Sequence, residues 1–368
     1  MKSQSVEEWI RQTKIRHQKC LSWQSNGRAA LALVVNPVQK QPPLEEWYSN
    51  EKVIFEYESI KLRNMMQVQS DILPVIHCNF NAAAIFSLFG ATVGYHENGP
   101  VYHPFFTDVE MIDKLEVPEA SGGLMPLILK SVRYCSKNAP AYVNIAMPFH
   151  HSPLDTAALL RGAEVFYLDC ILEKERMKKL LSVITEAFIQ AENYLNRSLN
   201  RTLENYINTH GIYFGNMIEI SDDCCVNLGP DLIRELDMYY LKQISKRLNI
   251  NLCTHYCVLN DNQGNHCIDP MLEASYIKCL NNQYSPEYFS SNYKRFENKL
   301  ALIHSGSIMR FGETADQRIE NFKVWAKEYL HSFKGKSGLI LYLSVPAIEE
   351  AKEIFEIWDS INRWSEIM

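Results

Sequence analysis

The sequence has neither an excess of positive charge nor a long hydrophobic run. It carries 37 lysines and arginines against 43 aspartates and glutamates, which gives a net charge of -6 and a pI near 6.0. Proteins that bind nucleic acid or anionic membranes present broad basic faces, so we expect neither as a partner. The longest nearly apolar stretch, residues 82–95, is too short to span a bilayer and is interrupted by Gly90 and Gly94.

We also expect neither a secretion signal nor an evenly spaced disulfide framework. Residues 1–14 place Glu7, Glu8 and Arg11 among apolar side chains, a pattern typical of an amphipathic helix. The ten cysteines are scattered, and Cys224 is adjacent to Cys225. This usage suits free thiols in a reducing compartment. We therefore predict a cytoplasmic protein with an N-terminal helical extension over residues 1–28.

The sequence also has no G-x-G-x-x-G turn after its first strand and no Walker loop, so a nucleotide-binding sheet is not favoured. It has instead short β-rich apolar runs that alternate with helical patterns. The eight runs are residues 30–35, 72–78, 141–147, 217–221, 250–256, 275–280, 300–304 and 339–345. They predict an α/β fold: a single (β/α)8 TIM-type barrel over residues 1–368 with helical insertions, a doubly wound open sheet being the alternative.

Helix boundaries can be predicted at several places between these strands. Apolar residues recur at helical spacing from Met177 to Leu195. Pro230 and Pro346 stand where first-turn prolines belong. Thr314 followed by Gln317 has the spacing of a capping box.

Polar residues follow most of the predicted strands, and in a barrel the carboxyl ends of the strands surround the active site. We expect catalytic roles for Asp222, His255, Cys257 and His304. We expect substrate contacts from Asn36, His77, Asn79, His150, Asp223, Asn281 and Arg310.

His255 and Cys257 are two residues apart in an extended run, so their side chains leave the same face. Imidazole and thiolate together suit zinc, although an inert buried thiol beside a core histidine has the same spacing. Catalytic zinc needs a third protein ligand and an open position. The sequence leaves the third ligand open among Cys225, Cys267, His304, Asp222 and Asp223.

Adjacent aspartates point in opposite directions if a strand continues through them. We expect Asp222 rather than Asp223 to face the barrel mouth, as an acid/base group, a substrate ligand or a partner of His255. The structural alternative is a cap for the helix that Pro230 opens. His77 and His304 could transfer protons or be structural, and Arg310 could hold a carboxylate or lie in solvent.

Three segments resemble the uroporphyrinogen decarboxylase superfamily, which includes corrinoid-dependent methyltransferases on the same barrel. The first runs from Pro148 through His150-His151-Ser152-Pro153 to Leu160-Arg161-Gly162, and the second from Ile220 through Asp222-Asp223 to Gly229-Pro230. The third, Thr254-His255-Tyr256-Cys257, resembles a His-x-Cys motif. The resemblance spans most of the chain.

The chain departs from both branches of this family. The decarboxylases have an arginine-rich segment after the first strand and an aspartate after the second; here residues 34–40 contain no arginine, and His77-Cys78-Asn79 follows the second strand. The methyltransferases hold zinc with His, Cys and a later Cys; here no cysteine follows Cys279, and Tyr342-Leu343-Ser344 occupies the expected place.

The resemblance therefore implies a methyltransferase in which zinc at His255 and Cys257 activates a small substrate and a separate corrinoid protein carries the methyl group. A metal-free carboxy-lyase that uses Asp222 or a histidine, with Arg310 or Arg161 holding carboxylates, is the alternative. A ligand-binding barrel without catalysis is a third reading. The resemblance to this family and the apolar residues 358–364 also suggest a homodimer.

Overall fold

A computed structural model describes residues 5–24, 28–38, 40–78, 80, 82–96, 99–148, 150–258, 260–333 and 338–362. The strands are β1 Ala30–Val35, β2 Val75–His77, β3 Val93–His96, β4 Gly99–Tyr102, β5 Asn144–Ala146, β6 His150–His151, β7 Tyr206–Ile207, β8 Tyr213–Gly215, β9 Met217–Ser221, β10 Asn251–His255, β11 Ile277–Asn282, β12 Ala301–Ser307 and β13 Leu339–Val345. The α-helices are α1 Val6–Leu21, α2 Leu44–Trp47, α3 Glu51–Val68, α4 Ala83–Phe86, α5 Met125–Asn138, α6 Pro153–Arg161, α7 Ala163–Leu172, α8 Lys174–Leu199, α9 Pro230–Ile233, α10 Tyr239–Leu248, α11 Ile268–Glu273, α12 Pro286–Phe296, α13 Ala315–Ser332 and α14 Ile348–Ile361.

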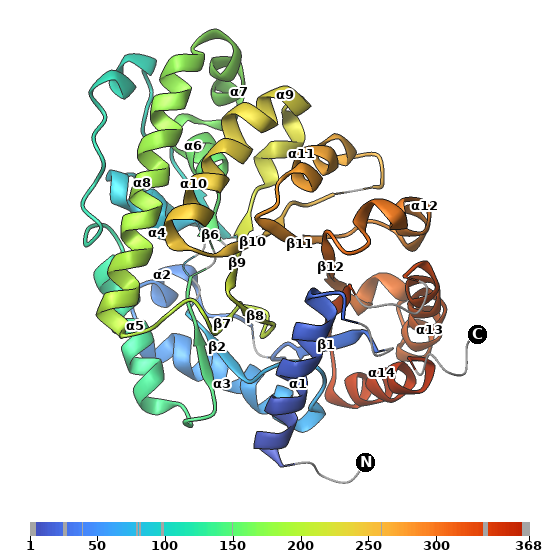
Figure 1. Ribbon diagram of the computed structural model, residues 1–368. Helices are drawn as coiled ribbons and strands as arrows, with labels where there is room; N and C mark the ends of the chain where they lie inside the picture. Colours follow the sequence, from blue (N-terminus) through green and yellow to red (C-terminus); the bar gives the residue numbers. More distant parts are fainter. Residues whose placement is uncertain are drawn as a thin grey trace.

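The central strands form the (β/α)8 barrel that the sequence predicts. Parallel strands pair in the order β1-β13-β12-β11-β10-β9-β6, and β2 pairs in parallel with β5. Because only residues 147–149 separate β5 from β6, these two short strands together form the third strand of the barrel. Each predicted run overlaps an observed strand, and the helices surround the strands on the outside (Figure 1).

The seam between β1 and β2 is closed near their amino ends by side-chain hydrogen bonds. The backbone N–H of Leu31 donates to Asp71 Oδ2 at 3.0 Å, and that of Leu33 donates to Ser70 Oγ at 3.0 Å. Asp71 N donates in turn to Leu31 O at 2.9 Å. Ser70 and Asp71 therefore satisfy buried backbone groups that a neighbouring strand would otherwise pair.

Near the carboxyl ends of β1 and β2, side chains of helix α3 form the hydrogen bonds to the backbone groups of the seam. Asn64 Nδ2 donates to Val35 O at 3.1 Å, and Glu58 Oε2 accepts from His77 N at 3.2 Å. Glu58 is buried, and Lys61 pairs with it at 2.6 Å. Side chains of α3 thus form part of the barrel wall.

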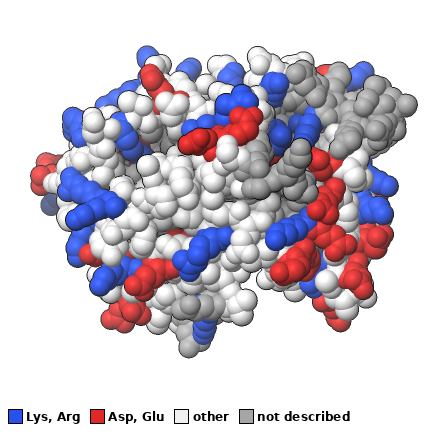
Figure 2. All heavy atoms as spheres, turned by 90° about the horizontal axis from the view of Figure 1, so that it is seen from below, with Lys and Arg blue, Asp and Glu red and all other residues white. Residues whose placement is uncertain are grey.

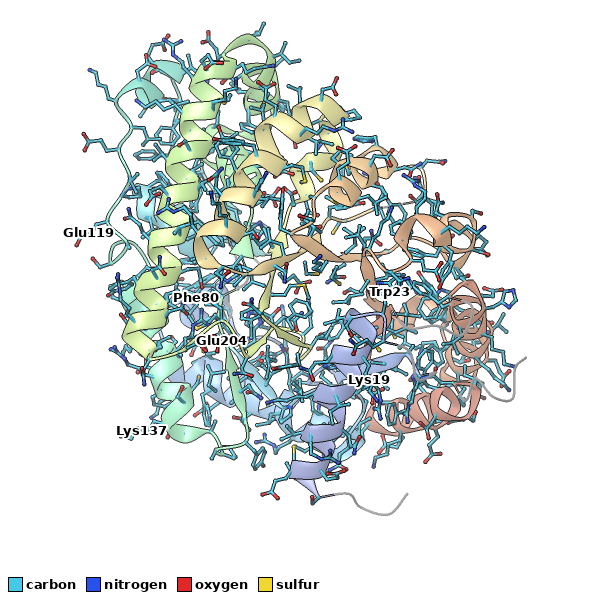
Figure 3. All side chains as sticks on the ribbon, in the orientation of Figure 1. Lys19, Trp23, Phe80, Glu119, Lys137 and Glu204 are labelled. Carbon is cyan, nitrogen blue, oxygen red and sulfur yellow. The ribbon has the colours of Figure 1, made fainter. Side chains whose placement is uncertain are left out.

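Helix α1 and the β7–β8 hairpin cover the amino-terminal end of the barrel. His17 accepts from Tyr213 N at 3.0 Å through Nδ1 and donates to Asp71 O at 2.9 Å through Nε2. Trp9 Nε1 donates to Ser70 O at 2.7 Å. Trp23, just past α1 and labelled in Figure 3, contacts the rings of Tyr293 and Phe333 at centroid distances of 6.1 and 6.2 Å. The predicted N-terminal extension thus includes a helix that packs on the barrel.

Several helix predictions are confirmed. Helix α8 buries the predicted apolar stripe, including Met177 and Leu195. Thr314 and Gln317 form both hydrogen bonds of the capping box at the start of α13. Pro230 occupies the first turn of α9, whereas α14 begins two residues after Pro346, at Ile348.

The surface offers no broad patch of one charge on the face that Figure 2 shows, where basic and acidic side chains are interspersed. None of the described helices is both long enough and apolar enough to cross a bilayer. All ten cysteines are free thiols, as the sequence predicts.

Replacing Asp71 with alanine should destabilise the protein strongly. Asp71 is 1% exposed, it pairs with Arg16 of α1, and it accepts the N–H of Leu31. Removing it leaves a partly buried guanidinium and a buried N–H without their partner, which costs about 3 to 5 kcal/mol of unfolding free energy. Chemical denaturation measures this loss.

The matched control is Asp359→Ala, which removes the carboxylate of the half-exposed Arg28–Asp359 pair. That change should lower the unfolding free energy by less than about 1 kcal/mol. Equal losses in the two variants would show that Asp71 does not hold α1 and β1 together.

Candidate metal centre

The register of β9 and β10 brings three potential metal ligands together at the carboxyl end of the barrel. Ser221 of β9 is paired with His255 of β10. Asp223 lies two residues after Ser221, and Cys257 lies two residues after His255. Cys257 N donates to Asp223 Oδ1 at 2.6 Å, and Cys257 Sγ lies 3.3 Å from His255 Nε2. One ligand atom from each of Asp223, His255 and Cys257 lies within 4.8 Å of the others.

Asp155 in α6 holds Asp223 in this position. The 3-10 helix η3, Asp223–Asn227, begins at the end of β9, and Asp155 accepts the backbone N–H groups of Asp223 at 3.2 Å and Cys224 at 2.8 Å. Asp155 is buried and also lies 3.3 Å from His151 Nδ1. Ser221 Oγ donates to Asp223 Oδ2 at 3.1 Å. The backbone of Asp223 is therefore held by α6, and its carboxylate by Ser221 and by the backbone of Cys257.

Four carboxyl groups lie close together around the loop that follows β9. Asp155, Asp222, Asp223 and Asp237 gather here, and in the described parts of the chain none of them forms an ion pair with lysine or arginine. Burial, together with the Asp155 carboxylate, raises the pKa of Asp222 to about 7. Burial and Asp222 likewise raise the pKa of Asp237 well above its usual value. Such a region is stabilised by a bound cation.

Asp222 does not face the barrel mouth, contrary to the expectation from the sequence. Its side chain is 0% exposed and interacts with Asp237, whereas Asp223 contacts Cys257. The alternation argument fails because β9 ends at Ser221 and the backbone turns into η3. Asp222 also makes no side-chain cap to η3.

A cavity of about 390 Å³ extends from His255 into the barrel. Its lining combines charged, polar and apolar side chains: Val34, Glu58, Lys61, Met65, Ile72, Val75, His77, Thr209, His210, His255, Asn281, Ser305 and Tyr342. His77, His255 and Asn281 are the predicted site residues that line it. Burial, and then Lys61, lower the pKa of His77 well below its usual value.

A buried polar network forms the base of this cavity. Glu219 accepts from Asn281 Nδ2 at 2.6 Å and lies 3.5 Å from His210 Nδ1. Burial alone would raise the pKa of Glu219, but His210 and Asn281 hold it at about 2. Ser305 Oγ donates to Asn281 Oδ1 at 2.6 Å. The predicted substrate contact Asn281 is thus oriented by both a carboxylate and a hydroxyl group.

His304 and Arg310 lie outside this cavity. Since Ser305 faces the interior, its neighbour His304 faces α13, where its Nδ1 lies 2.6 Å from Tyr329 Oη. Arg310 Nη2 lies 3.0 Å from His304 Nε2, and the guanidinium lies over the Trp325 ring at 4.6 Å. Burial, and then Arg310, lower the pKa of His304. Their positions support an anchoring role for His304 and do not support direct catalysis.

The structure places the remaining predicted contacts as follows. His150 packs against Phe188 at a centroid distance of 5.2 Å and near Glu192 on α8, outside the cavity lining. Asn36 is exposed after β1 and is also outside the lining. Asn79 lies outside the described residues.

The sequence interpretation missed Asp155 and Glu219. Glu219 had a visible signal, because a carboxylate in the middle of the apolar run 217–221 must find buried partners. Asp155 had no such signal, because an acidic residue in the first turn of a helix such as α6 is common.

The reactivity of Cys257 provides a test of this geometry. Burial and the Asp223 carboxylate raise the pKa of Cys257 to about 11. In chelator-treated protein, the alkylation rate of Cys257 by iodoacetamide should therefore rise with pH toward a midpoint near 11, and Asp223→Asn should lower that midpoint. Peptide mass spectrometry against pH measures both.

Asp231→Asn, which alters a fully exposed carboxylate on α9, is the control and should leave the midpoint unchanged. A wild-type midpoint at the ordinary thiol value of about 8.5 would contradict the described contact with Asp223.

Comparison with known proteins agrees with this architecture. Residues 75–282 match the family model described as uroporphyrinogen decarboxylase (URO-D). A methyltransferase from Methanosarcina mazei superposes with a TM-score of 0.67 at 16% identity, over 95% of this chain and 98% of that one. The carboxyl transferase domain of Rhizobium etli pyruvate carboxylase gives a TM-score of 0.39 at 8% identity, over 99% and 53% of the two chains, which is too low to support an argument. No curated protein matches the chain.

The matched segment is more than half of the chain and runs from β2 to β11, so it includes both strands that carry the candidate metal ligands. The methyltransferase likeness, at its low identity, concerns the fold alone. With its barrel and its family match, the chain belongs to the uroporphyrinogen decarboxylase family.

Proposed function

We propose that this protein is a metal-dependent methyltransferase that moves a methyl group from a corrinoid, carried on a separate protein, to a small thiol or hydroxyl substrate. The observation that carries the proposal is the convergence of Asp223, His255 and Cys257 at the carboxyl end of the barrel, with ligand atoms within 4.8 Å of one another. Catalytic zinc sites use three protein ligands and leave one position open for substrate.

The donor set fits zinc. It offers one oxygen, one nitrogen and one sulfur, and the carboxylate of Asp223 keeps lone pairs beyond those that accept from Cys257 N and Ser221 Oγ. The neighbouring carboxyl groups of Asp155, Asp222 and Asp237 have no lysine or arginine partner among the described residues, and a bound cation would favour their ionised forms. Asp223 would take the place of the later cysteine that this sequence lacks.

When bound, zinc lowers the pKa of a substrate thiol or hydroxyl so that this group becomes a nucleophile at neutral pH. The chain's own residues position the reactants. Asp155 fixes Asp223 through two backbone N–H groups, and Asn281, held by Glu219 and Ser305, presents a fixed amide beside His255. Preorganised groups of this kind reduce the entropic cost of the reaction.

The size of the cavity indicates where each of the two reactants would bind. A volume of about 390 Å³ is at the small end of the range for ligand sites, so the barrel holds the small methyl acceptor. The methyl donor, a corrinoid on its carrier protein, would then approach from the barrel mouth, where Cys257 is exposed.

The carboxy-lyase alternative receives less support from the lining. A substrate with many carboxylates needs several basic groups. The described residues that line the cavity include no arginine, and the lysine among them, Lys61, is already paired with Glu58 at 2.6 Å. Incubation with uroporphyrinogen should therefore leave its carboxylates intact, as mass spectrometry of the product would record.

Metal content is the direct test. Protein purified without a metal-binding tag should contain near-stoichiometric zinc by elemental mass spectrometry. His255→Ala, Cys257→Ser and Asp223→Asn should each lose it, because each removes a ligand. Asp155→Asn should weaken zinc affinity by about 10- to 100-fold, the usual effect of removing an outer partner of a ligand.

Two neighbouring residues provide matched controls. His266→Ala changes an exposed histidine, and Cys224→Ser changes the thiol next to Asp223, but neither residue belongs to the ligand cluster. Both variants should retain zinc. Wild-type protein that stays metal-free after reconstitution under reducing conditions would refute the metal-dependent proposal.

Methyl transfer can be followed with methylcobalamin as donor and 2-mercaptoethanol as a model acceptor. Zinc-loaded protein should accelerate the loss of methylcobalamin absorbance, and Cys257→Ser should reduce the rate by more than about 100-fold because a ligand loss exceeds the effect of an outer partner. His266→Ala should behave as wild type. Retained activity in Cys257→Ser would rule out this chemistry.

A further inference from the structure

Helix α3 places one ion pair in the cavity of the barrel. Lys61 Nζ donates to Glu58 Oε1 at 2.6 Å, and both residues line the cavity. Among the described residues of this lining, the others that can carry a charge at neutral pH are the histidines His77, His210 and His255. Burial, and then Lys61, lower the pKa of His77, so its ring is neutral at pH 7. Glu58 and Lys61 thus present one negative and one positive charge side by side.

Both members of this pair keep hydrogen-bonding capacity for a ligand. An ammonium group has three donors, and Glu58 is the carboxylate that pairs with Lys61 among the described residues. The Tyr57 ring, whose centroid lies 5.3 Å from Lys61 Nζ, offers a π face and no anion. Glu58 Oε2 accepts the backbone N–H of His77 at 3.2 Å, and each carboxylate oxygen has two lone pairs. Lys61 can therefore donate to a ligand, and Glu58 can accept from it.

The charges of the pair favour a ligand that carries both signs. A ligand that is only anionic or only cationic would meet a like charge beside the opposite one. An uncharged ligand would give the remaining donors of Lys61 no charged partner. A ligand with an ammonium group and a carboxylate satisfies both residues, and charges inside a protein are stable when they are paired and hydrogen-bonded.

The ion pair and the candidate metal centre lie on different parts of the barrel wall. Helix α3 contributes Glu58 and Lys61 at the seam between β1 and β2, whereas His255 ends β10, which comes after β2, β5–β6 and β9 around the wall. The same cavity of about 390 Å³ is lined by all three residues. A small molecule can therefore contact the ion pair with one end and approach His255 with the other.

We propose that Glu58 and Lys61 select the methyl acceptor, and that this acceptor is a small zwitterion of the amino-acid type, bound through its ammonium and carboxylate groups. Its thiol or hydroxyl group then points toward His255. The role of the bound molecule as a methyl acceptor rests on the proposed function, whereas the recognition of a zwitterion does not. Glu58 and Lys61 determine specificity and take no part in the transfer itself.

Binding to chelator-treated protein tests this recognition without methyl transfer. Four ligands of similar size differ in charge: 2-aminobutyrate is zwitterionic, butyrate is anionic, sec-butylamine is cationic and 2-butanol is uncharged. Ligand-observed NMR titrations at pH 7 measure their Kd values. 2-Aminobutyrate should bind more tightly than each of the others by about tenfold or more, because it alone gains charged hydrogen bonds to both residues.

Substitutions of the pair should change the order of the affinities. Lys61→Met leaves Glu58 without its cation, so this variant should bind sec-butylamine more tightly than 2-aminobutyrate. Glu58→Gln should instead favour butyrate. A purely structural role of the pair would lower all four affinities alike. Lys130→Met is the matched control, because Lys130 pairs at 2.9 Å with Glu51 of the same helix but is 62% exposed. The control should keep the order of the wild type.

Two results would overturn the proposal: a wild-type protein that does not prefer 2-aminobutyrate, or Lys61→Met and Glu58→Gln variants that keep the wild-type order. Circular dichroism and thermal melting establish that each variant is folded, and Lys61→Gln replaces Lys61→Met if that variant misfolds.

A second assay separates this proposal from the proposed chemistry. In zinc-loaded protein, free cysteine should be a better acceptor than 2-mercaptoethanol for the methyl group of methylcobalamin. Preferential binding of 2-aminobutyrate without methyl transfer to either thiol would support the zwitterion site and refute the methyltransferase. Methyl transfer to both thiols at equal rates, without preferential binding of 2-aminobutyrate, would refute the zwitterion site alone.

Discussion

The parallel register of β9 and β10 is the constraint from which the candidate site follows. Because Ser221 lies beside His255, the residues two positions further on each chain segment, Asp223 and Cys257, meet just past the sheet edge. A shift of one residue would exchange the inner and outer faces of the strand. His255 would then lose the cavity, and the three ligand types would no longer converge. Such a shift would also take the buried carboxylate of Glu219 away from its hydrogen bond with Asn281.

The sequence predicted the barrel, all eight strand positions and the pairing of His255 with Cys257, because these depend on periodicity within short segments. It did not predict which aspartate joins them. The backbone turn after Ser221 decides which of Asp222 and Asp223 points toward Cys257. Asp155, 67 residues before Asp222, holds that turn in place. Similarly, His210 meets Glu219 only because the β7–β8 hairpin folds under the barrel. Local sequence patterns do not predict contacts between segments that are distant in the sequence.

The metal centre and the cavity differ in whether their carboxyl groups have basic partners. Around Asp223, carboxyl groups gather without a lysine or arginine partner among the described residues. Burial, and then these carboxyl groups, raise the pKa values of Asp222 and Cys257, so this region favours a cation. Deeper in the barrel, each carboxylate has its own partner: Glu58 pairs with Lys61, and Glu219 with His210. The carboxyl groups without a basic partner are thus found at the mouth among the described residues. A neutral or weakly charged acceptor can enter the barrel at little electrostatic cost.

The seam between β1 and β2 has a consequence for how this fold can diversify. Elsewhere the wall consists of paired strands, whose spacing is set by backbone hydrogen bonds and tolerates little change. At the seam the wall consists of Glu58 and Asn64 from α3, and the nearby Lys61 lines the cavity. Substitutions on one face of a single helix therefore change the width and polarity of the chamber without moving any strand. This makes α3 the natural starting point for redesigning which acceptor the barrel admits.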